Sequence, residues 1–277
     1  MKEKSDRRIG IAFILNASFT VIEIIGAFYT NSMAILSDAV HDAGDSISLL
    51  LSYLFEKKSK KGADKSYTYG YERFSLLGAL VSSFVLFGAA IFILSQAIPR
   101  LFNPEDVDPV GMIILSIGGI LFNGLAVFKL KKGSTHHEKV VTLHLLEDFL
   151  GWSAILVTSI FLLFFHLPLI DTILAILITI YIVVHVSLNL LEVVRVLLQR
   201  VPSDINIDEL EEKVMAIKGI KKAYHTHVWS LEGSKTMCTM HITLEDSKDV
   251  KVMQKLKERV RDTLEDEGID HATIECD

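Results

Sequence analysis

Six long apolar segments dominate the first two thirds of the chain. Each has roughly the 20 residues that an α-helix needs to cross the hydrocarbon core of a bilayer. The chain is 50% hydrophobic with a mean hydropathy of +0.40, which is rich for a globular protein. We therefore predict an α-helical polytopic membrane protein with six transmembrane helices, at Ile9–Tyr29, Met33–Phe55, Phe74–Ile98, Val110–Phe128, Val140–Phe165 and Leu169–Leu191.

Basic residues mark one side of this predicted bundle. They crowd the N-terminus, the connection after the second helix and the connection after the fourth, whereas the opposite connections contain only Arg100. The positive-inside rule then places both termini in the cytoplasm. Because no organelle signal is evident and the chain is compact, the sequence favours the inner membrane of a bacterium.

The hydrophobic pattern changes after Pro202. It then predicts a helix (Ile207–Ile217, capped by Asn206 or Ser203), two strands (Ile220–Leu231 and Lys235–Leu244), a helix (Val250–Leu264) and a last strand (Ala272–Glu275). This order describes a small α+β domain that resembles the ferredoxin-like domains of metal chaperones. We therefore divide the chain into a transmembrane transport domain, 1–202, and a cytoplasmic metallochaperone-like domain, 203–277.

The segment 203–277 carries the whole net charge of −6. An acidic domain argues against nucleic acid as a partner and suits a domain that meets cations. The chain has two cysteines and no Cys-x-x-Cys pattern, so the sequence predicts no disulfide framework.

Two histidine-aspartate pairs with the same spacing lie inside apolar segments: His41 with Asp45, and His144 with Asp148. Residues four apart share one face of a helix. Together, two such faces offer two imidazole nitrogens and two carboxylate oxygens, a ligand set that suits tetrahedral zinc. Ionisable side chains are costly inside a bilayer, so a metal site explains them better than ordinary packing does.

Other polar residues fall in the same apolar segments. Asp38, Asp42 and Glu147 share the faces of the two pairs, where they either orient ligands, line the path of the ion or form contacts between helices. For Asn16, Glu23 and Asn123 a structural role is favoured over a role in the pathway. Asp171 is expected to cap a helix, and His185 to lie in the core.

Three segments carry a resemblance to a known family: Ser37-Asp-Ala-Val-His-Asp-Ala-Gly-Asp45, Tyr67-Thr-Tyr-Gly-Tyr-Glu-Arg73 and His144-Leu-Leu-Glu-Asp148. The chain resembles the cation diffusion facilitator family of zinc transporters over nearly its whole length. The resemblance implies that His41, Asp45, His144 and Asp148 form the transport site of a homodimeric zinc exporter. It implies zinc and protons as the exchanged ions, zinc as a regulatory ligand, and no prosthetic group.

The resemblance also implies a second zinc site in the cytoplasmic domain. Its candidate ligands are His227, His241, Glu275 and Asp277, with His271 and Cys276 as further candidates. Some relatives bind a metal in the loop between the second and third helices through an aspartate and two histidines. Here Asp64 matches, but tyrosines (Tyr67 and Tyr71) occupy the histidine positions and Ser75 replaces a frequent glutamate, so we expect no metal site in this loop.

Other functions remain open from the sequence. Cobalt, cadmium, iron(II) and nickel are alternative cargoes, because nitrogen and oxygen ligands do not separate these metals by affinity alone. A metal-sensing membrane receptor is a less favoured alternative, since it leaves the intramembrane pairs unexplained. An intramembrane metallo-hydrolase is disfavoured, because the chain has no His-Glu-x-x-His motif and four protein ligands leave zinc no open position. We therefore expect a transporter, not an enzyme.

Overall fold

The computed structural model describes residues 17–130, 136–245 and 249–277, without the side chains of Ser52 and of residues 126–144. A helix at Ala17–Thr30 is followed by five further helices: α2 (Met33–Ser59), α3 (Phe74–Phe102), α4 (Pro109–Leu130), α5 (His136–Phe165) and α6 (Leu169–Leu197). The described residues of these six helices fall on the predicted apolar segments, of which 9–16 lies outside the described residues, and the predicted fold class is confirmed.

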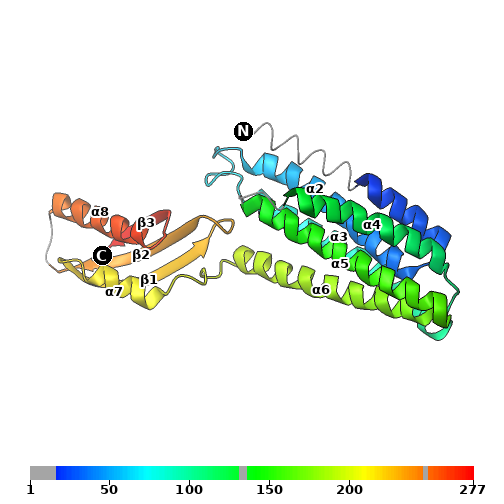
Figure 1. The fold of residues 1–277 in the computed structure, drawn as a ribbon. Coiled ribbons are helices and arrows are strands. Elements are labelled where there is room, and N and C mark those ends of the chain that lie inside the picture. Colours follow the sequence, from blue (N-terminus) through cyan, green and yellow to red (C-terminus); the bar gives the residue numbers. More distant parts are fainter. Residues whose placement is uncertain (1–16, 131–135, 246–248) are drawn as a thin grey trace. The chain divides into compact units, whose positions relative to one another are not determined.

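Contacts divide the chain into two compact units. The helical unit comprises Met1–Leu51 and Val81–Leu188. The carboxyl-terminal unit comprises Ser52–Leu80 and Asn189–Asp277. In Figure 1 the helices of the first unit run alongside one another as a bundle.

Within the described residues, three helical stretches are long and apolar enough to cross a membrane: α3, Leu145–Phe165 of α5, and α6. Ala17–Thr30 and Pro109–Leu125 are shorter apolar helices. α2 has 27 residues, but its apolar character is interrupted by acidic side chains. These acidic side chains are the ones that the sequence analysis identified within this apolar segment.

The core of the helical unit depends on one close approach between α4 and α5. Trp152 of α5 is fully buried. A Cβ atom added to Gly119 of α4 would lie 2.3 Å from Cδ2 of this indole, so only glycine leaves room for it. The ring of Phe19 packs edge-on against the same indole at 5.9 Å. The glycine therefore sets the position of α5.

Asp171 of α6 caps the first turn of α2. Its carboxylate accepts hydrogen bonds from the Ser32 hydroxyl (2.5 Å) and from the backbone N–H groups of Met33 (2.6 Å) and Ala34 (3.3 Å). These N–H groups have no partner within their own helix, and a negative charge at a helix N-terminus is favourable. The expected capping role is confirmed, but the capped helix is α2 and not α6.

His185 was expected in the core, and this prediction is wrong. The side chain is exposed on α6, where its ring lies 4.6 Å from the ring of Tyr181, four residues earlier on the same face. In a membrane protein the outward face of a helix is itself apolar, so apolar neighbours do not mark the interior.

The carboxyl-terminal unit contains the predicted helix-strand-strand-helix-strand order. Its elements are α7 (Ile207–Met215), β1 (Ile220–Ser230), β2 (Thr236–Leu244), α8 (Val250–Asp266) and β3 (His271–Cys276). The sheet has the order β1-β2-β3, with β1 and β2 antiparallel and β2 and β3 parallel. Asn206 caps α7, as predicted, and Asp249 caps α8.

The apolar faces of these two helices meet the sheet in one core. Leu210 and Val214 of α7, and Val260 and Leu264 of α8, are buried there with Met240 and Ile242 of β2. This core holds β2 and β3 in register, and the register sets which residues of the two strands lie beside each other.

We expect Asp171→Ala to destabilise the protein by about 2 kcal/mol, because it removes a helix cap and leaves buried donors without an acceptor. The measurement is thermal unfolding in detergent, with the exposed loop variant Asp106→Ala as the control. Equal melting temperatures for the two variants would contradict this role of Asp171.

Candidate metal-binding sites

α2 places the first predicted pair one turn apart. The Nε2 atom of His41 lies 3.6 Å from Oδ2 of Asp45, and these side chains are 17% and 19% exposed. The Nδ1 atom of His41 is buried, and no described residue hydrogen-bonds to it. An unsatisfied imidazole nitrogen is costly in an apolar interior, so the pair is suited to binding a cation.

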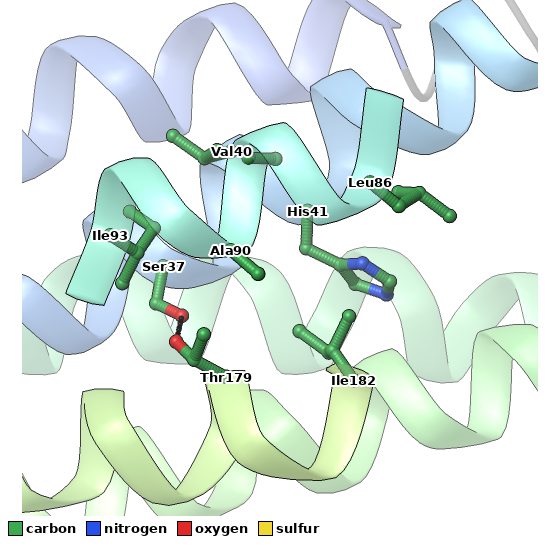
Figure 2. Close-up of a pocket in the computed structure, with 9 residues that line it drawn as sticks. Ser37, Val40, His41, Leu86, Ala90, Ile93, Thr179 and Ile182 are labelled. Atoms are coloured by element: carbon green, nitrogen blue, oxygen red, sulfur yellow. Dashed lines mark hydrogen bonds between the residues drawn. The ribbon is translucent and has the colours of Figure 1, made fainter. Parts of the chain in front are cut away.

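Figure 2 shows His41 beside a small cavity between α2, α3 and α6. The cavity measures ≈ 10 Å³, which is about the space of one water molecule. At its edge the hydroxyl groups of Ser37 and Thr179 share a hydrogen bond of 3.0 Å, which ties α2 to α6. The remaining lining is apolar: Val40, Leu86, Ala89, Ala90, Ile93 and Ile182.

α5 brings the second pair to the first. Asp148 is buried, and Asp45 of α2 lies close enough to act on it electrostatically. Two carboxylates within electrostatic reach of each other in an apolar bundle repel unless a cation or proton compensates them. His144 lies one turn before Asp148 on α5, but its side chain is outside the described residues. The described residues thus place Asp45 and Asp148 within electrostatic reach of each other, with His41 beside Asp45.

The three acidic residues that share the helix faces of the two pairs take different positions. Asp38 and Asp42 are buried on α2. A Cβ atom added to Gly151 of α5 would lie 3.4 Å from Oδ1 of Asp38, so Asp38 faces α5. Glu147 is half-buried and accepts a hydrogen bond from the hydroxyl of Tyr181 on α6.

One further acid is buried in the helical unit. Glu23, for which a structural role was favoured over a role in the pathway, is 0% exposed. The signal was present in the sequence, because Glu23 is the only carboxylate in the apolar stretch Ile9–Tyr29.

A second group of ligand-type side chains lies on β2 and at the end of β3. His241 is the register partner of Glu275, and one ligand atom from each of His241, Glu275 and Asp277 lies within 4.8 Å of the others. His241 Nδ1 is 3.1 Å from Asp277 Oδ2, and His241 Nε2 is 3.6 Å from Glu275 Oε2. The hydroxyl of Tyr224 also donates to Asp277. Hydrogen bonds from Tyr224 and His241 hold the pKa of the Asp277 carboxyl below its usual range, which keeps it ionised for a metal.

His227, predicted for the same site, is not the cross-strand partner of His241. Tyr224 takes that place, because the pairing of β1 with β2 shifts between Tyr224 and His227. His225 lies in this irregularity with a φ of 53°, and its ring is 4.7 Å from His227 and 4.9 Å from His241. His225 was missed, although the His-x-His spacing at 225–227 was visible.

The two further candidates lie in other environments. The ring of His271 contacts the ring of Tyr69 at a centroid distance of 6.2 Å. Burial raises the pKa of the Cys276 thiol, which makes the metal-binding thiolate less available.

The loop before α3 is organised around Asp64. Its carboxylate accepts hydrogen bonds from Lys61 (2.9 Å) and from the hydroxyl of Tyr71 (2.8 Å), and these bonds hold the pKa of Asp64 well below its usual range. A lysine ammonium thus satisfies the carboxylate. Ser75 donates to the carbonyl of Glu72 at the start of α3, and Arg73 donates to the carbonyl of Leu231 (3.0 Å) within the carboxyl-terminal unit.

Nearly the whole chain matches two protein-family domains. Residues 9–198 match the cation efflux transmembrane domain, and residues 202–277 match the cytoplasmic domain of cation efflux proteins. The chain therefore belongs to the cation diffusion facilitator family, whose members are cation efflux proteins, and it is a multi-pass membrane protein.

Curated relatives cover nearly the same length. The metal cation efflux system protein CzcD of Cupriavidus metallidurans is 30% identical over 98% of this chain and 86% of its own length. The cadmium, cobalt and zinc/H(+)-K(+) antiporter of Bacillus subtilis is 28% identical over 96% and 87%. The zinc transporter ZitB of Pectobacterium atrosepticum is 30% identical over 99% and 86%.

We expect His241→Ala to weaken zinc binding at the β2–β3 group by about tenfold or more, because it removes the only nitrogen ligand of the three. The measurement is calorimetric zinc titration of the full chain carrying Asp45→Ala and Asp148→Ala, which isolates this group. His271→Ala serves as a matched histidine control. Equal zinc affinity in the His241 and His271 variants would contradict the assignment.

Proposed function

We propose that this protein exports zinc from the cytoplasm in exchange for protons, through one site formed by His41, Asp45, His144 and Asp148. The observation that carries the proposal is that buried Asp148 of α5 lies within electrostatic reach of Asp45 of α2, with His41 beside Asp45. Transport of a cation explains the cost of placing ionisable groups on two helices of an apolar bundle.

The chemistry of these side chains couples the two ions. Zinc binds neutral imidazole and ionised carboxylate, so its arrival displaces protons and its departure allows them to return. A site that opens alternately to the two sides of the membrane then moves zinc one way and protons the other. The inward proton gradient drives zinc out of the cytoplasm.

Zinc is the favoured cargo because the four ligands combine two nitrogens and two oxygens. Cadmium, cobalt, iron(II) and nickel are the alternatives, and two relatives named above carry cadmium, cobalt or a general metal-cation label. The name of the Bacillus relative also includes potassium, so counter-ion measurements need arms with and without potassium.

The cytoplasmic group is proposed as a regulatory zinc site in a homodimer. His241, Glu275 and Asp277 are its ligands, and His227 is the fourth candidate because the ring of His225 contacts the rings of both His227 and His241. Zinc that binds the folded dimer stabilises it by linkage. This domain begins at about residue 203, and with both termini cytoplasmic it meets the cytoplasmic metal pool of a bacterium.

Two other classes compete with a transporter. A membrane metal sensor would use the cytoplasmic site and show zinc binding without zinc movement. An intramembrane hydrolase needs an open zinc position, which four protein ligands do not leave. Zinc flux together with a test for peptide hydrolysis distinguishes the three classes.

We expect Asp45→Ala and Asp148→Ala each to reduce zinc transport at least tenfold, because each removes a ligand from the site. The measurement is zinc uptake into proteoliposomes under an imposed pH gradient, with internal pH followed at the same time. Asp106→Ala, at an exposed loop aspartate, is the control. Flux that survives both ligand substitutions would contradict the four-ligand site, and zinc binding without flux in the unmodified protein would favour the sensor.

A further inference from the structure

Glu23 is a buried acid that the proposed zinc site does not use. It lies on the helix Ala17–Thr30, and its side chain is fully buried in the helical unit. No hydrogen-bond donor among the described residues reaches either of its carboxyl oxygens. An ionised carboxylate in this position would lose its hydration without compensation, so the structure requires another state of the group.

The charged groups around Glu23 are all acidic. The carboxyl group of Asp42 on α2 lies within hydrogen-bonding range, while Asp38 of α2 and Asp148 of α5 act on Glu23 electrostatically. No lysine or arginine of the described chain acts on it. These acids therefore make an ionised Glu23 still less favourable.

A proton bound to Glu23 removes the repulsion between its carboxylate and the neighbouring acids. Two carboxyl groups in contact form a hydrogen bond only if one of them is protonated, because an ionised carboxylate only accepts. A hard metal cation is a poorer fit, since calcium and magnesium take about six or more oxygen ligands, far more than this contact supplies.

We propose that Glu23 carries one of the transported protons, hydrogen-bonded to Asp42 and outside the ligand set of the metal. This inference rests on the proposed zinc/proton exchange. Zinc bound by Asp148 compensates a negative charge that acts on Glu23, so Glu23 ionises and its proton leaves to the cytoplasm. When zinc departs, the negative field returns and Glu23 takes up a proton from the outer side.

The test compares Glu23→Gln with Glu56→Gln in proteoliposomes. Glu56 is an exposed glutamate near the end of α2 and pairs with Lys60, so the second variant is a matched control. Three quantities are measured: protons moved per zinc, the pH dependence of zinc transport, and exchange of labelled zinc for unlabelled zinc without a pH gradient.

We expect Glu23→Gln to move about one proton fewer per zinc and to flatten the pH dependence, because glutamine cannot exchange a proton. Zinc exchange should stay within twofold of the control, since the metal ligands remain. An unchanged proton-to-zinc ratio would overturn the proposal. Loss of zinc exchange in a folded Glu23→Gln protein would also overturn it, because Glu23 would then serve the metal site. No proton movement in the unmodified protein would instead reject the exchange mechanism itself.

If the Glu23→Gln variant does not fold, a measurement on the unmodified chain tests the proposal in its place. A hydrophobic carbodiimide adds to protonated carboxyl groups, and mass spectrometry locates the adduct. We expect Glu23 to be modified without zinc and protected with zinc. Equal labelling in both conditions, or none at Glu23 in either, would overturn the proposal.

Discussion

The burial of carboxyl groups in an apolar bundle is the constraint on which the structure of this protein depends. Asp38, Asp42 and Asp148 are buried in the helical unit together with Glu23. An uncompensated charge there costs several kcal/mol. The bundle is therefore stable only with protons or cations among these groups. Groups that bind either protons or cations can exchange the one for the other.

The rest of the helical unit holds these groups in place. Asp171 fixes the start of α2, the Ser37–Thr179 hydrogen bond joins α2 to α6, and Gly119 admits the indole of Trp152 so that α5 packs against α4. None of these contacts touches a metal ligand. They set the positions from which α2 and α5 present their carboxylates, and small displacements of either helix change the distance between Asp45 and Asp148.

Much of this organisation is predictable from the sequence. The helices follow from long apolar runs, the αββαβ order of the carboxyl-terminal unit from its periodicity, and the proposed transport site from two pairs with one spacing. The prediction for His185 failed because apolar neighbours mark lipid-facing surfaces as well as cores. The neighbours of His241 were not predictable from alternation, since the irregular pairing at His225 shifts the register of β1 against β2. The importance of Glu23 depends on which helices surround it, which a single segment does not reveal.

The central claim is that α2 and α5 supply two imidazoles and two carboxylates to one zinc ion. X-ray absorption spectroscopy at the zinc edge tests it directly, on protein carrying His241→Ala to prevent zinc binding at His241, Glu275 and Asp277. The account predicts four nitrogen or oxygen neighbours at about 2.0–2.1 Å, two of them with the outer-shell scattering of imidazole. A spectrum with one imidazole or none, or with a sulfur neighbour at about 2.3 Å, would contradict it.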